Sequence, residues 1–124
     1  MRIYMSRVFI VQEPLKRDHE TGQLVPIMDF TRAREYGELI ICLRSGPVAL
    51  AANHTINQLK EVLKDFSDND YLLFAGDPSA IALASAVASE INNGFFQMLK
   101  WDKASKSYIK VSAQIKTRRT ECQN

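Results

Sequence analysis

Hydrophobic residues in this sequence fall into two patterns that alternate along the chain. Short contiguous apolar runs are typical of strands whose two faces are both buried. These runs are residues 8–11, 39–43 and 71–75. Between the second and third runs, Ile56, Leu59 and Leu63 recur at the spacing of one helix face. This alternation of strand and helix patterns predicts a parallel or mixed sheet covered by helices.

The clearest strand–turn–helix unit covers residues 71–93. Gly76 permits a tight turn after the strand. Pro78 suits the first helical position, because its missing amide hydrogen is not needed there. The Asp77 carboxylate is placed to cap the free amides of that first turn. The predicted helix Ser79–Ile91 is rich in Ala and Ser, so it can approach a sheet closely.

The remaining segments add strands at both ends of the chain. Arg7–Gln12 predicts a first strand, and Leu24–Met28 predicts an edge strand that pairs back on it. Pro26 would confine that second strand to an edge. A short helix is predicted through Tyr36, capped by Asp29 or Thr31. The other predicted features are an exposed loop or hairpin tip at 15–23, a capping box at Thr55–Gln58 opening a helix to Phe66, a left-handed helix end at 92–94, a strand from Phe95, a hairpin turn at 103–107 and an alternating strand at Tyr108–Ile115.

These features together predict an α/β (or α+β) fold. We expect a mixed sheet with a β-α-β-α-β core at about residues 38–99, two main helices and a C-terminal antiparallel hairpin. The 124 residues fit one domain, which we assign to residues 1–116, with 117–124 as a flexible basic and polar tail. No apolar run is long enough to cross a bilayer, and no signal peptide is evident. We therefore expect a soluble, cytoplasmic protein with no membrane contact.

Candidate catalytic and metal-binding residues are sparse. Cys42 lies in an apolar run and Cys122 in the polar tail, so we expect no disulfide in a reducing compartment. His19 and His54 are isolated, and no pair of Cys or His has metal-ligand spacing. The sequence assembles no Ser/His/Asp or Cys/His arrangement and no paired carboxylates. The hypothesis is a non-enzymatic protein without metal or cofactor.

Positive charge gathers at the C-terminal end. From Lys100 onward seven basic residues stand against two acidic ones, so this segment carries +5 and the first 99 residues carry −3. Cations there could neutralise phosphates, and an exposed aromatic ring could stack on a base. The candidate nucleic-acid-binding residues are Lys100, Trp101, Lys103, Lys106, Tyr108, Lys110, Arg118 and Arg119. The alternative is that Trp101 packs in the core and the lysines only protect an edge strand from aggregation.

A second hypothesis is a small-molecule or nucleotide-binding protein, or a small enzyme, with its site at the carboxyl ends of the strands near Gly76–Ser79, where open α/β sheets bind ligands. Its candidate anion-binding residues are Arg44, Ser45, Gly76 and Ser79. The helix start near Ser79 offers free amides to a phosphate. Against this hypothesis, the Asp77 carboxylate would repel phosphate, and the turn lacks the lysine and further glycines of phosphate-binding loops.

Five segments spread over most of the chain carry a resemblance. They are Val8–Pro14, Glu35–Leu39, Gly76–Ile81, Asn92–Gly94 and Leu99–Asp102 with Tyr108 downstream. They look like the corresponding parts of small, uncharacterised proteins encoded by tailed bacteriophages. The resemblance implies a viral gene product made in the cytoplasm of a bacterial host, and it implies no activity and no functional residues. A third hypothesis fits such an accessory protein: a module that binds a host protein or self-assembles into a homo-oligomer.

Overall fold

The computed structural model describes residues 6–48 and 52–116. In chain order its elements are β1 (Arg7–Gln12), β2 (Leu15–Arg17), β3 (Leu24–Pro26), the 3₁₀ helix η1 (Thr31–Tyr36), β4 (Glu38–Leu43), α1 (Asn53–Val62), β5 (Tyr71–Leu73), α2 (Pro78–Ile91), β6 (Phe95–Asp102) and β7 (Ser107–Gln114). The predicted tail at 117–124, with Arg118 and Arg119, lies outside the described residues. Within those residues, no helix has the length and apolar character needed to cross a membrane.

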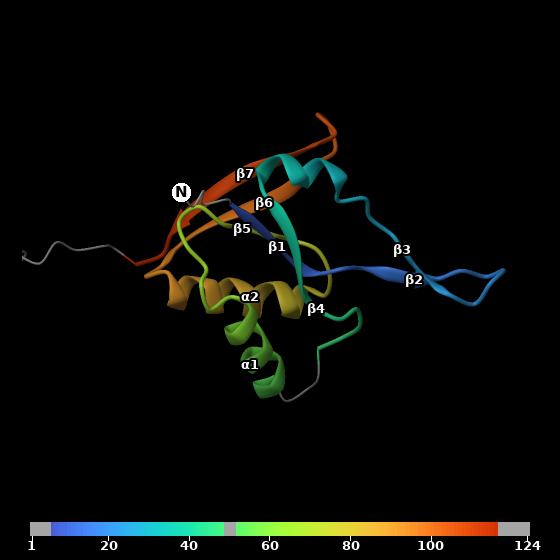
Figure 1. Cartoon of the computed structure of the whole chain (residues 1–124), viewed down its shortest axis with the longest axis horizontal. Helices are drawn as coiled ribbons and strands as arrows, with labels where there is room; N and C mark the ends of the chain where they lie inside the picture. Colours follow the sequence, from blue (N-terminus) through green and yellow to red (C-terminus); the bar gives the residue numbers. More distant parts are fainter. Residues whose placement is uncertain (1–5, 49–51, 117–124) are drawn as a thin grey trace, which may run out of the picture.

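A five-stranded sheet in the order β4-β1-β5-β6-β7 forms the centre of the molecule (Figure 1). The first four strands are parallel, and β7 runs antiparallel to β6. The predicted mixed sheet, its β4-α1-β5-α2-β6 core and its closing hairpin are confirmed. The patterns did not place β1, which inserts between β4 and β5. That position explains its apolar run, because Val8–Val11 is buried on both faces of the sheet.

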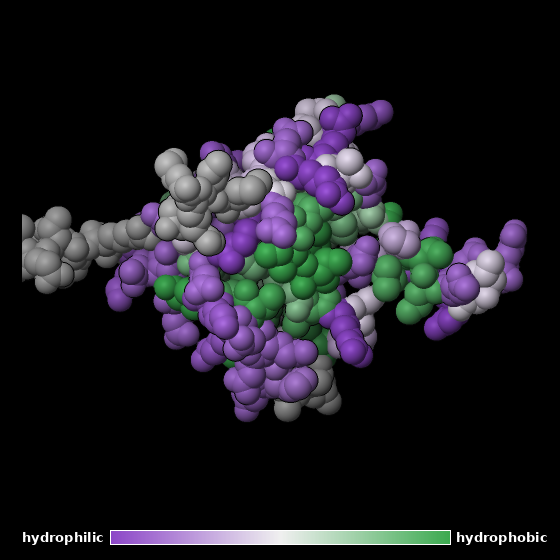
Figure 2. Space-filling view, viewed as in Figure 1, coloured by the Kyte–Doolittle hydropathy of each residue, from purple (hydrophilic) through white to green (hydrophobic). Residues whose placement is uncertain are grey.

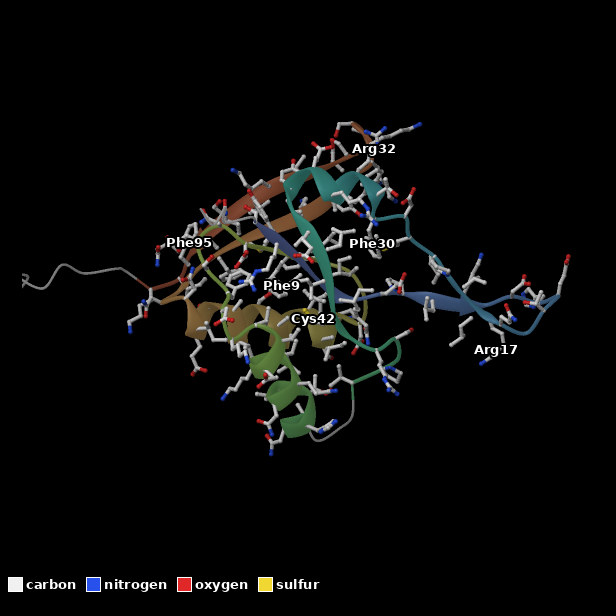
Figure 3. The ribbon with its side chains drawn as sticks, in the orientation of Figure 1. Phe9, Arg17, Phe30, Arg32, Cys42 and Phe95 are labelled. Carbon is white, nitrogen blue, oxygen red and sulfur yellow. The ribbon has the colours of Figure 1, made fainter. Side chains whose placement is uncertain are left out.

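The two faces of the sheet are covered unequally. On the helix face, α1 and α2 pack over a core that contains Phe9, Leu72 and Phe96. On the η1 face, the shorter segment of Phe30 and η1 covers Ile10 and Leu73. Figure 3 shows Phe9 on the side of the helices and Phe30 on the side of η1. The sheet is therefore the middle layer, with a full helical layer on only one side.

A buried carboxylate ties the start of β1 to the loop before β5. Asp70 is 2% exposed and accepts hydrogen bonds from the Arg7 backbone amide at 3.0 Å and from the Arg7 guanidinium at 2.9 Å. It also accepts from the Ser67 amide at 2.9 Å. The Arg7 guanidinium lies 5.0 Å from the centre of the Phe9 ring. Bonding to Asp70 raises the pKa of Arg7 above its ordinary value, so the guanidinium stays charged.

The prediction that Leu24–Met28 pairs back on the first strand is wrong. β3 instead pairs antiparallel with β2 in a separate two-stranded ribbon, which projects from the body of the molecule (Figure 1). Its turn is held by Asp18, whose carboxylate accepts from the Thr21 amide at 3.1 Å. This local turn closes a hairpin before the chain can return to β1, and Pro26 sits on the ribbon edge as its missing amide hydrogen requires.

None of the three predicted helix starts is closed by a side-chain cap bond. The 3₁₀ helix η1 has Phe30 as its N-cap residue, so the predicted cap at Asp29 or Thr31 is wrong. Asp77 is the N-cap residue of α2 as predicted, but its carboxylate makes no cap hydrogen bond and instead accepts from the Val48 amide at 3.3 Å. α1 begins at Asn53, so Thr55 lies inside the first turn, and the helix ends at Val62 before Phe66. At Asp77 a contact distant in sequence replaces the cap bond, and a local cap pattern does not reveal such a contact. The predicted left-handed end of α2 is confirmed by positive φ angles at Asn93 and Gly94.

Candidate nucleic-acid interface

The β6–β7 hairpin pairs eight residues of each strand and projects its turn at the upper edge of the molecule (Figure 1). The turn is fixed by Asp102, whose carboxylate accepts from the Ser105 amide at 3.0 Å and from the Ser105 hydroxyl at 2.6 Å. These bonds, together with the nearby Lys100, lower the pKa of Asp102. Lys106 adopts a positive φ of 55°, which the tight turn demands. The hairpin therefore presents a defined tip.

Trp101 lies on the η1 face of the hairpin, directly opposite Tyr108. Its side chain is 40% exposed, whereas Tyr108 is 4% exposed. The two ring centres are 5.0 Å apart in an edge-to-face arrangement, a favourable geometry for aromatic pairs. Tyr36 of η1 donates its hydroxyl to the Tyr108 carbonyl at 3.0 Å. Trp101 is thus an exposed ring held from behind by a buried one.

The lysines of the hairpin lie on different sides of Trp101. Lys110 shares its face of the sheet, since Leu99 pairs with Lys110 and Trp101 with Tyr108. Lys103 and Lys106 lie in and beside the turn, and both are exposed. Lys100 points to the helix face, where it pairs with Ile109. Four lysines against Asp102 give the hairpin a charge of +3.

Tyr108 cannot stack on a base itself, because its ring is buried. Burial raises the pKa of its hydroxyl, and the nearby Asp29 carboxylate raises it further. Tyr108 therefore supports Trp101 and stays protonated. Of the eight predicted residues, Trp101 and Lys110 lie on one face of the hairpin, and Lys103 and Lys106 lie at its turn. Lys100 lies on the other face, and Tyr108 is buried. The remaining two residues lie outside the described part of the chain.

The carboxyl ends of β1, β4 and β5, where the alternative anion site was predicted, are closed by Gln12. This side chain is 4% exposed. Its amide nitrogen donates to the carbonyls of Arg44 and Gly46, both at 2.6 Å, and its amide oxygen accepts from the Asp77 backbone at 2.7 Å. Gln12 therefore fastens the loop after β4 to the loop after β5. One signal in the sequence points to Gln12: it is a polar residue that ends an apolar strand pattern.

Gly76 belongs to the same arrangement. Its φ is +108°, and a Cβ there would lie 2.4 Å from the Cβ of Gln12, so only glycine fits. Hollows of about 480 and 330 Å³ are lined in part by Gln12, and Ser45 contributes to both. Arg44 lines the larger one and Ser79 lines neither. The predicted anion-binding residues do not converge on one point.

Cys42 of β4 points toward the helices (Figure 3), and burial raises the pKa of its thiol to about 12. The thiol therefore stays protonated near neutral pH and is a poor nucleophile. In residues 6–48 and 52–116, no three His, Cys, Asp or Glu side chains come together in a group that could hold a metal ion.

A comparison with protein families finds one match of long extent. The family model described as "Phage Pam3 gp32-like protein" matches residues 6–115. No curated protein and no solved structure matches the chain.

Proposed function

The chain belongs to the Phage Pam3 gp32-like protein family, and we propose that this phage protein is a non-enzymatic module that binds single-stranded nucleic acid through the β6–β7 hairpin. One observation carries the proposal: Trp101 is 40% exposed on a basic hairpin. An aromatic ring of this size normally contributes to a core or to an interface. Core packing of Trp101, the competing explanation for this segment, does not account for that exposure.

Stacking is the recognition mode that fits Trp101. Proteins that bind single strands place successive bases on aromatic rings within a basic groove, and each stacked base contributes about 1–3 kcal/mol. The edge-to-face contact with Tyr108 limits the tilt of the indole ring, which reduces the entropy lost when a base stacks on it. Trp101 is the only tryptophan of the chain, so one base per bound protein would stack on an indole ring.

The lysines around Trp101 are placed for phosphates. Lys103, Lys106 and Lys110 are exposed and belong to the turn or the same face. When such cations bind single-stranded nucleic acid, counterions are released from its phosphates. The logarithm of the binding constant then falls linearly with the logarithm of the salt concentration, with a slope of about −0.7 for each phosphate contact. Three contacts predict a shallow but measurable salt dependence. Double-stranded DNA offers no unstacked base to Trp101 and is expected to bind more weakly.

The intrinsic fluorescence of Trp101 provides a direct test. Titration with oligothymidylate at low salt is expected to quench the emission of Trp101, and anisotropy of a dye-labelled oligonucleotide gives the affinity. Trp101→Ala is expected to weaken binding by about 5- to 150-fold, corresponding to one stacked base. Lys103→Ala is expected to reduce the salt slope by about 0.7.

A matched control distinguishes the hairpin from general positive charge. Lys60 is exposed on α1, so Lys60→Glu changes the net charge as much as Lys103→Glu does. Only the hairpin substitution should weaken binding strongly. Equal losses from both variants, or no binding of any oligonucleotide at low salt, would show that the hairpin is only a protected strand edge.

A further inference from the structure

The other edge of the sheet, β4, is an apolar strand with no neighbour beyond it in the described residues. After Glu38 its sequence is Leu-Ile-Ile-Cys-Leu, and Ile41 is 48% exposed. Strand edges in natural proteins are usually protected by charges, proline or bulges, since unpaired amides and carbonyls invite another strand. β4 carries none of these devices between Leu39 and Leu43. Figure 2 shows hydrophobic surface across the middle of this side of the molecule, bordered by hydrophilic residues.

Hollows flank this edge on both faces of the sheet. On the η1 face, a hollow of about 620 Å³ is lined by Ile41, Leu39 and Met28 among others. On the helix face, a hollow of about 580 Å³ lies between Cys42 and Val62 of α1. An added strand points successive side chains to alternate faces. An edge strand with a hollow on each side is therefore suited to receive an extended segment, with main-chain bonds along the edge and side chains in both hollows.

Charge identifies the occupant. β4 begins with exposed Glu38, and exposed Arg44 follows its last residue. Neither side chain forms an ion pair within the described part of the chain. If a second β4 pairs antiparallel with Ile41 opposite Ile41, Glu38 of each copy faces Arg44 of the other. The same register sets Ile40 opposite Cys42, and both of these side chains lie on the helix face.

We propose that β4 is the interface between two copies of this chain, which pair antiparallel about a two-fold axis at Ile41 and join their sheets into one. Residues directly opposite in an antiparallel pair lie on the same face. Ile41 of both copies therefore lies on the η1 face, beside the hollow there, and Glu38 and Arg44 both lie on the helix face. A closed two-fold pair leaves no unpaired β4 edge, so assembly stops at the dimer.

The test compares the same substitution at the two edges of the sheet. Ile41→Lys places a charge at the two-fold axis, and Ile109→Lys places it on β7, where Ile109 is 38% exposed. Sedimentation velocity over a concentration series is expected to show a dimer for the unmodified chain and for Ile109→Lys. Ile41→Lys is expected to raise the dimer dissociation constant at least about 100-fold, because two like charges meet in an apolar seam. Circular dichroism checks that each variant is folded.

Charge reversal at two exposed positions tests the register. Glu38→Arg or Arg44→Glu alone is expected to weaken the dimer about tenfold, because both symmetry-related pairs become repulsive at once. The double variant restores opposite charges across the seam and is expected to recover most of the lost affinity.

Three results would overturn the proposal. If the unmodified chain stays monomeric at every concentration, two copies do not pair through β4, and the partner of this edge would be a strand of a different protein. A dimer weakened equally by Ile41→Lys and Ile109→Lys places the interface elsewhere. A double charge reversal as weak as the single ones excludes the antiparallel register about Ile41.

Discussion

The two edge strands of the sheet, β4 and β7, differ in the side chains that accompany their unpaired backbone amides and carbonyls. β4 ends a parallel ladder and carries five consecutive apolar residues after Glu38. β7 ends the sheet with an antiparallel strand in which polar and apolar residues alternate, and its hairpin carries four lysines. Lysines near an edge discourage pairing with another strand. The difference fits a β7 edge that meets solvent or a polyanion and a β4 edge that meets another strand.

The comparison also separates local from distant stabilisation. β7 is joined to β6 by a short turn and gains further support from η1. β4 reaches the sheet only through β1, and the start of β1 is fastened by Asp70, 63 residues away along the chain. The β4 edge therefore depends on contacts between residues that are distant along the chain.

Removal of Asp70 is expected to have the largest effect. Asp70→Ala removes the acceptor of the Arg7 and Ser67 backbone amides and leaves the Arg7 guanidinium only its bond to the Asp65 carbonyl, and breaking such a pair costs up to about 3–5 kcal/mol. Urea denaturation measures the loss. Glu61→Ala is the control, because the Glu61–Lys64 pair is exposed and such pairs contribute at most about 1 kcal/mol. If Asp70→Ala lowers the free energy of unfolding no more than Glu61→Ala does, the hydrogen bonds of Asp70 contribute little to stability.

The second largest effect is expected from alkaline pH, which should lower the free energy of unfolding through the Cys42 thiol of β4. The pKa of the Cys42 thiol is about 12 in the folded protein and ordinarily 9.0. Between these values the unfolded chain loses the thiol proton and the folded protein keeps it. The stabilisation is therefore complete below about pH 9 and falls as the pH rises, by up to about 1.4 kcal/mol per pH unit.

Denaturation curves between neutral pH and alkaline pH check this expectation. Cys42→Val should remove this part of the slope, whereas Cys122→Ser, which leaves the β4 thiol in place, should keep it. An unchanged slope in Cys42→Val would assign the alkaline loss to other groups.

The bond that ties η1 to β7 is expected to have the smallest effect. Tyr36→Phe removes the hydroxyl that donates to the Tyr108 carbonyl and should cost about 0.5–1.5 kcal/mol. Tyr71→Phe is a matched control, because its ring contacts that of Tyr36 and its hydroxyl forms no hydrogen bond in the described residues. The emission of Trp101 should shift only in Tyr36→Phe. Equal losses of stability in both variants would argue against the bond.

The sequence predicted those parts of the fold that depend on neighbours along the chain. The strand patterns, α2 and the β6–β7 hairpin are local, and the structure confirms them. The partner of β3 was wrong because a tight turn pairs β3 with β2. Asp77 is the predicted N-cap residue, but its carboxylate bonds to the distant Val48 amide. The cap at Thr55 was wrong because α1 starts earlier, at Asn53. The insertion of β1 into the sheet has no local signature.

The same division holds for the candidate site. Charge and aromatic residues marked the hairpin from sequence, yet only the structure separates exposed Trp101 from buried Tyr108 and moves Lys100 to the opposite face. The alternating pattern of β7 did not reveal that Ile109 and Val111 are partly exposed, because the pattern does not show how far α2 extends over the sheet. β4 reads as a core strand from sequence, and its position at an edge follows from sheet order alone.

The place of β1 between β4 and β5 has a consequence for synthesis on the ribosome. β1 is translated before both of its neighbours, so its apolar residues have no ladder to join while the ribbon and η1 are being made. The centre of the sheet closes only after Leu73 has left the exit tunnel, because β5 ends there. Pairing between distant strands is also slow. The nascent amino-terminal segment therefore exposes the apolar run of β1 until β5 has emerged, and such surface is prone to aggregation.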